Sequence, residues 1–307
     1  MDQKRLKNVL KQADNDEDIL RSLRDCLHQS YGIYFADEKL YSFSNKINQR
    51  IRELPVDDLE EYVQYFCDNR SEEIQKFLDK VSTNKTLFFR EAKHWQFLEN
   101  HILPSLSSNN TPIKMWSAAC STGEEPYTLS MIMEDRLNEA LRPSQWKTNT
   151  NGHSRPNYKI LATDIARKAV MHAQNGIYKQ KKLENVRDYD ESYVRRFFEP
   201  VEETRDQYRI KDCLRNSSTF RKFNLKNNKY PFEGTFSLVL CRNVLIYFDD
   251  EMVKHVINQL CQSLEPGGYL FVGHTESLQN IDHGLEKVQS AVYRRPKTSR
   301  VRNRDRP

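Results

Sequence analysis

The sequence predicts an α/β protein in which a doubly wound, Rossmann-like sheet follows an N-terminal helical domain. Two observations predict this fold. Up to about Lys80, apolar residues recur every three or four positions with almost no glycine, whereas from Ile113 onwards short apolar strands alternate with amphipathic helices. A length of 307 residues fits a main domain of about 200 residues with a smaller companion. We therefore expect a helical domain over residues 1–80 and a sheet domain over residues 81–296.

The helical domain is predicted to carry a basic stripe. One helix has an apolar face formed by Leu40, Phe43, Ile47 and Ile51, and a basic face formed by Lys39, Lys46 and Arg50. Two interpretations stay open at this point. The stripe is either an ordinary solvated face or a docking surface for an acidic protein helix.

The sheet domain is predicted from strands and helices that alternate along the chain. The expected strands are 113–116, 159–163, 237–241 and 269–272, and the expected helices are 126–137, 166–174 and 250–264. A turn at 265–268, Glu-Pro-Gly-Gly, is expected to end the last helix. Residues 178–219 mix charged stretches with alternating pieces, which predicts a small inserted β-subdomain. We expect a polar surface insertion at 142–156 and a basic disordered tail at 297–307.

Composition excludes several classes of protein. The longest apolar runs are far too short to cross a bilayer, and the first residues lack the apolar stretch of a signal peptide, so we expect a cytoplasmic protein without membrane insertion. The 43 acidic and 48 basic residues nearly balance, which argues against a nucleic-acid partner. Six scattered cysteines are expected to be reduced thiols. No metal site is expected, because the histidines lack ligand spacing along the sequence.

The strongest local signal is the segment 116–127, Trp-Ser-Ala-Ala-Cys-Ser-Thr-Gly-Glu-Glu-Pro-Tyr. A strand, a loop of small residues and a helix with proline in its first turn form the nucleotide-cofactor crevice of a doubly wound sheet. A dinucleotide site needs more than one glycine, and Glu124 and Glu125 would repel a pyrophosphate. Carboxylates suit an ammonium or sulfonium ligand, which favours S-adenosylmethionine over NAD. The alternative is that the two glutamates merely cap the helix.

Polar residues follow the later strands as well. Asp164 ends the second strand, where a carboxylate can accept both ribose hydroxyls, although it is equally suited to cap the next helix. Asn224 could read the edge of an adenine. Arg242, Asn243 and Tyr247 emerge at the carboxyl edge of the predicted sheet, where ligands commonly bind. The alternative for each is hydrogen bonding within its own loop.

Arg90 is the candidate for holding a carboxylate. Phe88 and Phe89 are expected to anchor the segment to the sheet domain, which leaves the planar guanidinium of Arg90 available. The alternative is a surface ion pair with Glu91 or Asp79.

Taken together, these motifs resemble the chemotaxis-receptor protein-glutamate O-methyltransferase family. The resemblance is carried, in the same order, by 83–91 (Thr-Asn-Lys-Thr-Leu-Phe-Phe-Arg-Glu), 117–127, 241–248 (Cys-Arg-Asn-Val-Leu-Ile-Tyr-Phe) and 273–276 (Gly-His-Thr-Glu). It extends from about Tyr31 to Tyr293. The run at 241–248 is far more specific than a general methyltransferase signature.

The resemblance implies a transfer of methyl groups from S-adenosylmethionine to glutamate carboxylates of methyl-accepting chemotaxis receptors, with S-adenosylhomocysteine as product. It implies that the cofactor pocket is lined by Asn84, Thr86, Arg90, Glu124 or Glu125, Asp164, Asn224, Leu225, Arg242 and Asn243. Arg90 and Tyr247 would face the reacting centre, and Arg50 and Arg52 would meet the receptor's methylation helices. In some members the β-subdomain grips a receptor C-terminal peptide.

Two other classes of function remain open from sequence alone. The first is an enzyme of the same fold that methylates a nucleic acid or a small molecule. The second is a non-catalytic module that binds the cofactor or a receptor.

Overall fold

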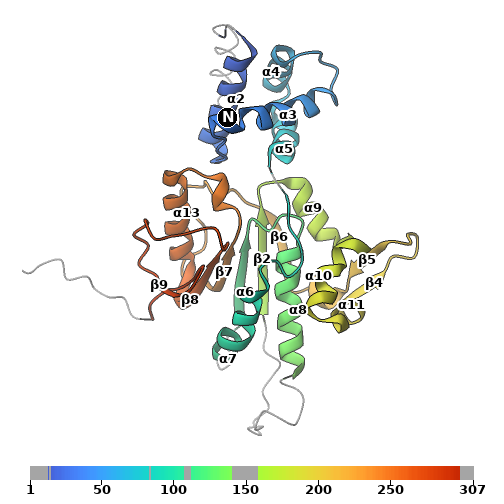
Figure 1. Cartoon of the computed structure of the whole chain (residues 1–307), viewed down its shortest axis with the longest axis vertical. Coiled ribbons are helices and arrows are strands. Elements are labelled where there is room, and N and C mark those ends of the chain that lie inside the picture. The colour runs from blue at the N-terminus through green and yellow to red at the C-terminus, as the bar shows by residue number, and fades with distance from the viewer. Residues whose placement is uncertain (1–12, 14, 83, 107–111, 140–157, 298–307) are drawn as a thin grey trace, which may run out of the picture.

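The computed structural model describes residues 13, 15–82, 84–106, 112–139 and 158–297 (Figure 1). The N-terminal part is helical and lies above the sheet domain in this view. Its helices are α2 (Asp16–Tyr31), η1 (Asp37–Lys39), α3 (Leu40–Ile51), α4 (Leu59–Asp68) and α5 (Arg70–Val81). Local chemistry sets their ends, because the Asn15 and Asp58 side chains cap α2 and α4, and Gly32 ends α2 at φ +78°.

The predicted basic stripe is wrong at Arg50, because this residue is buried. Its side chain is only 6% exposed, and it forms a two-pronged ion pair with Glu73 at 2.7 Å for each nitrogen–oxygen contact. The reason is helical spacing: Arg50 comes seven residues after Phe43, so it shares the buried face of α3 with that ring. The prediction that Arg50 contacts a receptor is therefore wrong. Arg52, just after α3, is exposed.

The sheet domain contains one seven-stranded sheet. In spatial order its strands are β6 (Ser218–Lys222), β2 (Tyr158–Asp164), β1 (Ile113–Ala118), β7 (Phe236–Cys241), β8 (Leu264–Val272), β10 (Val292–Arg294) and β9 (Glu286–Gln289). The first five are parallel, and β10 and β9 continue the sheet in antiparallel pairs. Strand order reverses between β1 and β7, which places a topological switch point there, and the predicted doubly wound fold is confirmed.

Helices cover both faces of this sheet. One face packs against α6 (Ala92–Phe97), α8 (Glu124–Glu139) and α9 (Arg167–Asn175), and the other against α13 (Asp250–Ser263). Alternation along β1 explains the division, since Met115 belongs to the first core and Trp116 to the second. Short helical turns η2 (Leu98–Ile102) and α7 (Leu103–Leu106) extend α6.

The four predicted strands are present, each with bounds one or more residues longer, whereas β6, β9 and β10 were not predicted. The predicted turn at 265–268 is wrong in extent, because α13 ends at Ser263 and β8 begins at once. Gly267 sits at φ +86° inside β8 and donates its amide to the Arg295 carbonyl. Residues 265–268 have no register partners on β7, because Phe236 pairs with Leu264 and Leu238 with Tyr269, so the chain bulges at the predicted turn and then rejoins the ladder.

A second, three-stranded antiparallel sheet lies beside the main one, as predicted (Figure 1). Its strands are β3 (Ile177–Lys179), β5 (Gln207–Ile210) and β4 (Phe198–Pro200), with β5 in the centre. The inserted segment around this sheet also contains helical elements that were not predicted: η3 (Gln180–Leu183), α10 (Glu184–Tyr189), α11 (Glu191–Phe197) and α12 (Asp212–Arg215).

None of the helices that the structure describes is long and apolar enough to cross a membrane. The predicted insertion at 142–156 and all but the first residue of the predicted tail at 297–307 lie outside the described residues.

Candidate active site

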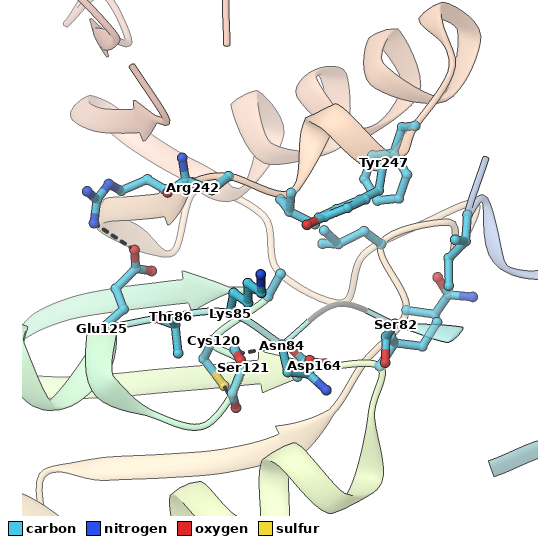
Figure 2. A pocket seen from close by; sticks show the side chains of 18 of the residues that line it. Ser82, Asn84, Lys85, Thr86, Cys120, Ser121, Glu125, Asp164, Arg242 and Tyr247 are labelled. Atoms are coloured by element: carbon cyan, nitrogen blue, oxygen red, sulfur yellow. Dashed lines mark hydrogen bonds and ion pairs between the residues drawn. The ribbon is translucent and has the colours of Figure 1, made fainter. Parts of the chain in front are cut away.

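A pocket opens at the carboxyl ends of β1, β2, β6 and β7, at the switch point of the sheet (Figure 2). Its empty volume is about 1010 Å³, including solvent at the mouth, which suffices for a nucleoside-sized ligand and part of a second molecule. Tyr31, Ile33 and Phe35 of the N-terminal part close one side. Of the predicted site residues, the lining includes Asn84, Thr86, Arg90, Glu125, Asp164, Asn224, Leu225, Arg242, Asn243 and Tyr247.

The loop after β1 lets a ligand approach the backbone. Ala119, Ser121 and Gly123 all have positive φ values, of 68°, 50° and 97°, so the loop folds back tightly. A Cβ on Gly123 would lie 2.7 Å from the Ala173 Cβ, so only glycine fits. The Ser121 hydroxyl is buried and has no hydrogen-bond partner among the described residues. An orphaned hydroxyl in a pocket wall indicates a place for a polar ligand atom.

Asp164 stands at the end of β2 beside this loop. Its Oδ2 accepts a hydrogen bond from the Ser121 amide at 2.8 Å, and its Oδ1 accepts one from the Ala166 amide at 2.9 Å. Helix α9 has Ala166 as its N-cap, so Asp164 is not the helix cap that one alternative assumed. Burial raises the pKa of the Asp164 carboxyl, and the backbone amides act against that shift. The carboxylate thus lies in the wall with lone pairs left for a ligand.

Glu125 and Arg242 join the start of α8 to the end of β7. Arg242 Nη1 donates to Glu125 Oε2 at 2.9 Å (Figure 2). The Ser117 hydroxyl donates to Glu125 Oε1 at 2.7 Å. Burial raises the pKa of the Glu125 carboxyl, whereas Arg242 and Ser117 lower it. The Arg242 side chain is 1% exposed and its guanidinium carbon lies 5.1 Å from the centre of the Trp95 ring. This ion pair holds the Glu125 carboxylate at a fixed position in the pocket wall.

Glu124 does not line the pocket, which corrects half of the prediction for the two glutamates. It is fully buried and ion-paired with Lys182 of η3 at 2.8 Å, and it accepts a hydrogen bond from the Thr122 hydroxyl at 2.6 Å. Adjacent residues on a helix point about 100° apart. One glutamate therefore faces the pocket and the other faces the small subdomain.

Sequence reasoning missed two acidic residues that hold the site together. Glu91 Oε2 accepts from Arg242 Nη2 at 3.0 Å, and Glu91 Oε1 accepts from Asn243 Nδ2 at 3.1 Å. Glu276 accepts hydrogen bonds from the backbone amides of Asn243 at 2.9 Å and Leu245 at 2.8 Å. Asn243 has φ +57°, and these contacts fix it there. Glu91 lies in the motif at 83–91 and Glu276 in the motif at 273–276. Their place in these motifs was the sequence signal that could have identified them as site residues.

Arg90 lines the pocket with its guanidinium largely uncommitted. Nη1 donates to the Lys85 carbonyl at 3.1 Å, and within the described residues no carboxylate pairs with it. The partners that a surface ion pair would need are occupied elsewhere, because Glu91 contacts Arg242 and Asp79 accepts from the Lys168 amide. Arg90 can therefore receive the carboxylate of a ligand.

Tyr247 lies at the end of η4 (Leu245–Tyr247), on the upper side of the pocket in Figure 2. Its carbonyl accepts the Tyr34 amide at 2.8 Å, which ties the loop after β7 to the N-terminal part.

The remaining predicted lining residues come from two loops. Asn84 and Thr86 belong to the segment after α5, and Lys182 Nζ fixes this segment through the Thr86 carbonyl at 2.8 Å. Asn224 and Leu225 follow β6, where Asn224 Oδ1 accepts the Lys226 amide at 2.9 Å.

The pocket fits S-adenosylmethionine by its donor set. The Ser121 hydroxyl, which has no partner among the described residues, and the Asp164 carboxylate offer partners for hydroxyl groups, and the Glu125 carboxylate can accept hydrogen bonds from an ammonium group. The helix α8 begins with two glutamates, which disfavours phosphate there.

Comparison with known proteins agrees with this geometry. The SAM-binding domain of the CheR methyltransferases matches residues 84–294, and their all-alpha domain matches residues 18–82. The chemotaxis protein methyltransferase of Borreliella burgdorferi is 32% identical over 288 residues, covering 91% of this chain and 94% of that protein. The chemotaxis protein methyltransferase of Escherichia coli is 32% identical over 275 residues, 89% of each chain. The chain therefore belongs to the CheR family of S-adenosylmethionine-dependent methyltransferases.

Proposed function

We propose that this enzyme methylates glutamate side chains on the cytoplasmic domains of chemotaxis receptors, forming glutamyl methyl esters and S-adenosylhomocysteine. The observation that carries the proposal is the uncommitted guanidinium of Arg90, placed in the same pocket as Asp164 and Glu125. A cationic fork beside a cofactor pocket suits a carboxylate acceptor. The relatives' names as chemotaxis protein methyltransferases support a protein of the chemotaxis system as substrate.

The residues that would hold the cofactor follow from their chemistry. Asp164 would accept the ribose hydroxyls, Asn224 would bind the adenine edge, and Glu125 would face the cationic end. Asn84, Thr86, Leu225, Arg242 and Asn243 would complete the wall. When bound, S-adenosylmethionine supplies a methyl group activated by a sulfonium.

The protein's own contribution is orientation and exclusion of water. A receptor glutamate has a reference pKa of ~4.3, so it is ionised near neutral pH and requires no strong general base. Arg90 would orient this carboxylate, and the Tyr247 hydroxyl would donate a hydrogen bond in the same region. Holding two reactants in near-attack geometry removes ~7 kcal/mol or more of the barrier. Ile33 and Phe35 line the pocket on the side of the N-terminal part and would limit the access of water.

A thiol in the same pocket is kept from competing as a nucleophile. Burial, together with the charges of Asp164 and Glu125, raises the pKa of the Cys120 thiol well above its usual range. The thiol therefore stays protonated while a glutamate is ionised. All six cysteines are free, which accords with a cytoplasmic enzyme acting on cytoplasmic receptor domains.

The small subdomain would serve as a tether. Its strand β4 lies at an edge of the three-stranded sheet and has one side available for pairing. An extended receptor C-terminal peptide could add to such an edge by main-chain hydrogen bonds. Titration of a fluorescent peptide with the C-terminal sequence of a cognate receptor tests this part: saturable binding supports the tether, and its absence limits receptor recognition to the other surfaces.

The reaction is tested by transfer of radiolabelled methyl groups from S-adenosylmethionine to purified receptor cytoplasmic domains, followed by base treatment. Label on the receptor that base releases as methanol supports carboxylate methylation. Cofactor binding without such label would point to another substrate, and the absence of both would favour a non-catalytic module.

A further inference from the structure

A cluster outside the pocket lining contains Glu91, His94 and His274. One ligand atom from each residue lies within 4.8 Å of the other two. His94 is 1% exposed, yet neither of its ring nitrogens makes a hydrogen bond of good geometry to any residue that the structure describes. Its Nδ1 lies 3.3 Å from Glu91 Oε2 without meeting hydrogen-bond geometry. The buried Nε2 in particular has no hydrogen-bond partner among the described residues, and such an atom requires an explanation.

The two imidazoles meet edge to face. Their ring centres are 4.3 Å apart at an interplanar angle of 76°, and the buried His94 ring also contacts Phe271. His274 is exposed, so the cluster is open to solvent on that side. A tetrahedral ion with bonds of ~2.0–2.1 Å needs ligand atoms ~3.3 Å apart, so a modest rotation of the exposed His274 ring would close the set.

We propose that Glu91, His94 and His274 form a binding site for one zinc ion, whose binding weakens the hold of the pocket on the cofactor. Two imidazole nitrogens and one carboxylate oxygen are a donor set that zinc takes, with water completing four-coordination.

Competition for Glu91 explains the effect on the cofactor. The same carboxylate holds Arg242 at 3.0 Å and Asn243 at 3.1 Å, and both of these residues line the pocket. An ion that binds Glu91 withdraws negative charge from Arg242 and loosens Asn243. By thermodynamic linkage, bound cofactor must then lower the affinity for zinc by the same factor. Zinc binding itself does not depend on the proposed methyl transfer; only the coupling rests on the cofactor pocket.

Isothermal titration of metal-free protein with zinc chloride tests the site. The exposed Cys213 is first replaced by serine, so that its thiol does not bind the metal. We expect one zinc ion per chain with micromolar or tighter affinity. His274→Ala, a change of an exposed residue, should weaken binding about tenfold or more. His101→Ala, which removes an exposed histidine outside the cluster, serves as the matched control and should leave the affinity unchanged.

The coupling is measured by titrating S-adenosylhomocysteine with and without saturating zinc. We expect zinc to weaken this binding about threefold or more in the protein with His274 and to have no effect in His274→Ala. Absence of zinc binding, or equal affinity in His274→Ala, would overturn the site. Zinc binding with an unchanged affinity for S-adenosylhomocysteine would overturn the competition for Glu91.

Discussion

Arg242 and Glu125 are 117 positions apart in the sequence, yet Arg242 Nη1 lies 2.9 Å from Glu125 Oε2. The same guanidinium reaches back to the segment before the sheet, where Nη2 donates to the Arg90 carbonyl at 2.6 Å and to Glu91 at 3.0 Å. One buried cation thereby joins three segments that form the pocket. The position of Arg90, on which the proposed chemistry depends, is set through this contact.

Replacing Arg242 should therefore damage both stability and binding. Arg242→Gln leaves Glu91 and Glu125 without their cation, so we expect the free energy of unfolding to fall by about 3–5 kcal/mol. Chemical denaturation measures this change, and calorimetry should show a parallel loss of affinity for S-adenosylhomocysteine. Arg294→Gln is the matched control, because within the described residues Arg294 donates one hydrogen bond, to the Gly267 carbonyl, and lies over the Tyr269 ring without a carboxylate partner, so it should cost about 1 kcal/mol. Equal effects of the two changes would contradict the account.

Gly123 should tolerate no side chain. Its φ of +97° and the predicted contacts of a Cβ with Ala173 and with the Tyr178 hydroxyl at 2.8 Å would force the loop after β1 to move. We expect Gly123→Ala to lower stability by about 1–3 kcal/mol and to weaken cofactor binding. Gly234→Ala, also at positive φ but with nothing within 4 Å of its Cβ, should cost about 1 kcal/mol and leave binding intact. An undisturbed affinity in Gly123→Ala would show that the loop does not contact the cofactor.

Glu91 should make stability depend on pH in the acid range. Burial acts to raise the pKa of its carboxyl, but His94, Arg242 and Asn243 together hold it well below its usual range. A lowered pKa in the folded state gives stability that is fully present above the unfolded pKa of ~4.3 and is lost as pH falls below it. The difference in unfolding free energy between the natural chain and Glu91→Gln should thus be constant from neutral pH to about pH 5 and shrink at lower pH.

Denaturation curves from pH 7 to about pH 3, in the presence of a chelator, measure this difference. A difference that grows on acidification would mean that Glu91 is not held ionised by its neighbours.

Arg90 should matter more for transfer than for cofactor binding. Because its guanidinium has no carboxylate partner among the described residues, Arg90→Ala removes a ligand contact and little internal structure. We expect kcat/KM for receptor methylation to fall about 100-fold, with less than about threefold change in the Kd for S-adenosylhomocysteine. Arg167→Ala, at an exposed position of α9, should change neither quantity. Equal losses in kcat/KM and in the affinity for S-adenosylhomocysteine would show that Arg90 binds the cofactor and not the receptor carboxylate.

Much of the fold was predictable because β1, β2, β7 and β8 are buried apolar runs separated by helical periodicity. The short strands β6, β9 and β10 were not, since β6 and β9 consist mostly of exposed residues and β10, although buried at Val292 and Tyr293, is only three residues long. Pairing with neighbours in space decides such strands, and local sequence does not.

The site shows the same limit at the level of single side chains. Sequence alone could not tell which of Glu124 and Glu125 faces the pocket, because the orientation of α8 relative to the small subdomain decides which of them contacts Lys182. It misplaced Arg50, since a basic residue on an apolar face becomes recognisable only when its partner Glu73 is seen. His94 and His274 lie 180 positions apart, so spacing along the chain could not reveal their proximity.

Methylation of receptor glutamates is tested most directly by peptide mass spectrometry of a receptor cytoplasmic domain after incubation with this enzyme and S-adenosylmethionine carrying a deuterated methyl group. We expect deuterated methyl esters on glutamate side chains, formed by the natural chain and strongly reduced with Arg90→Ala. Methyl groups on lysine, arginine or cysteine side chains, or an unlabelled receptor despite bound cofactor, would contradict it.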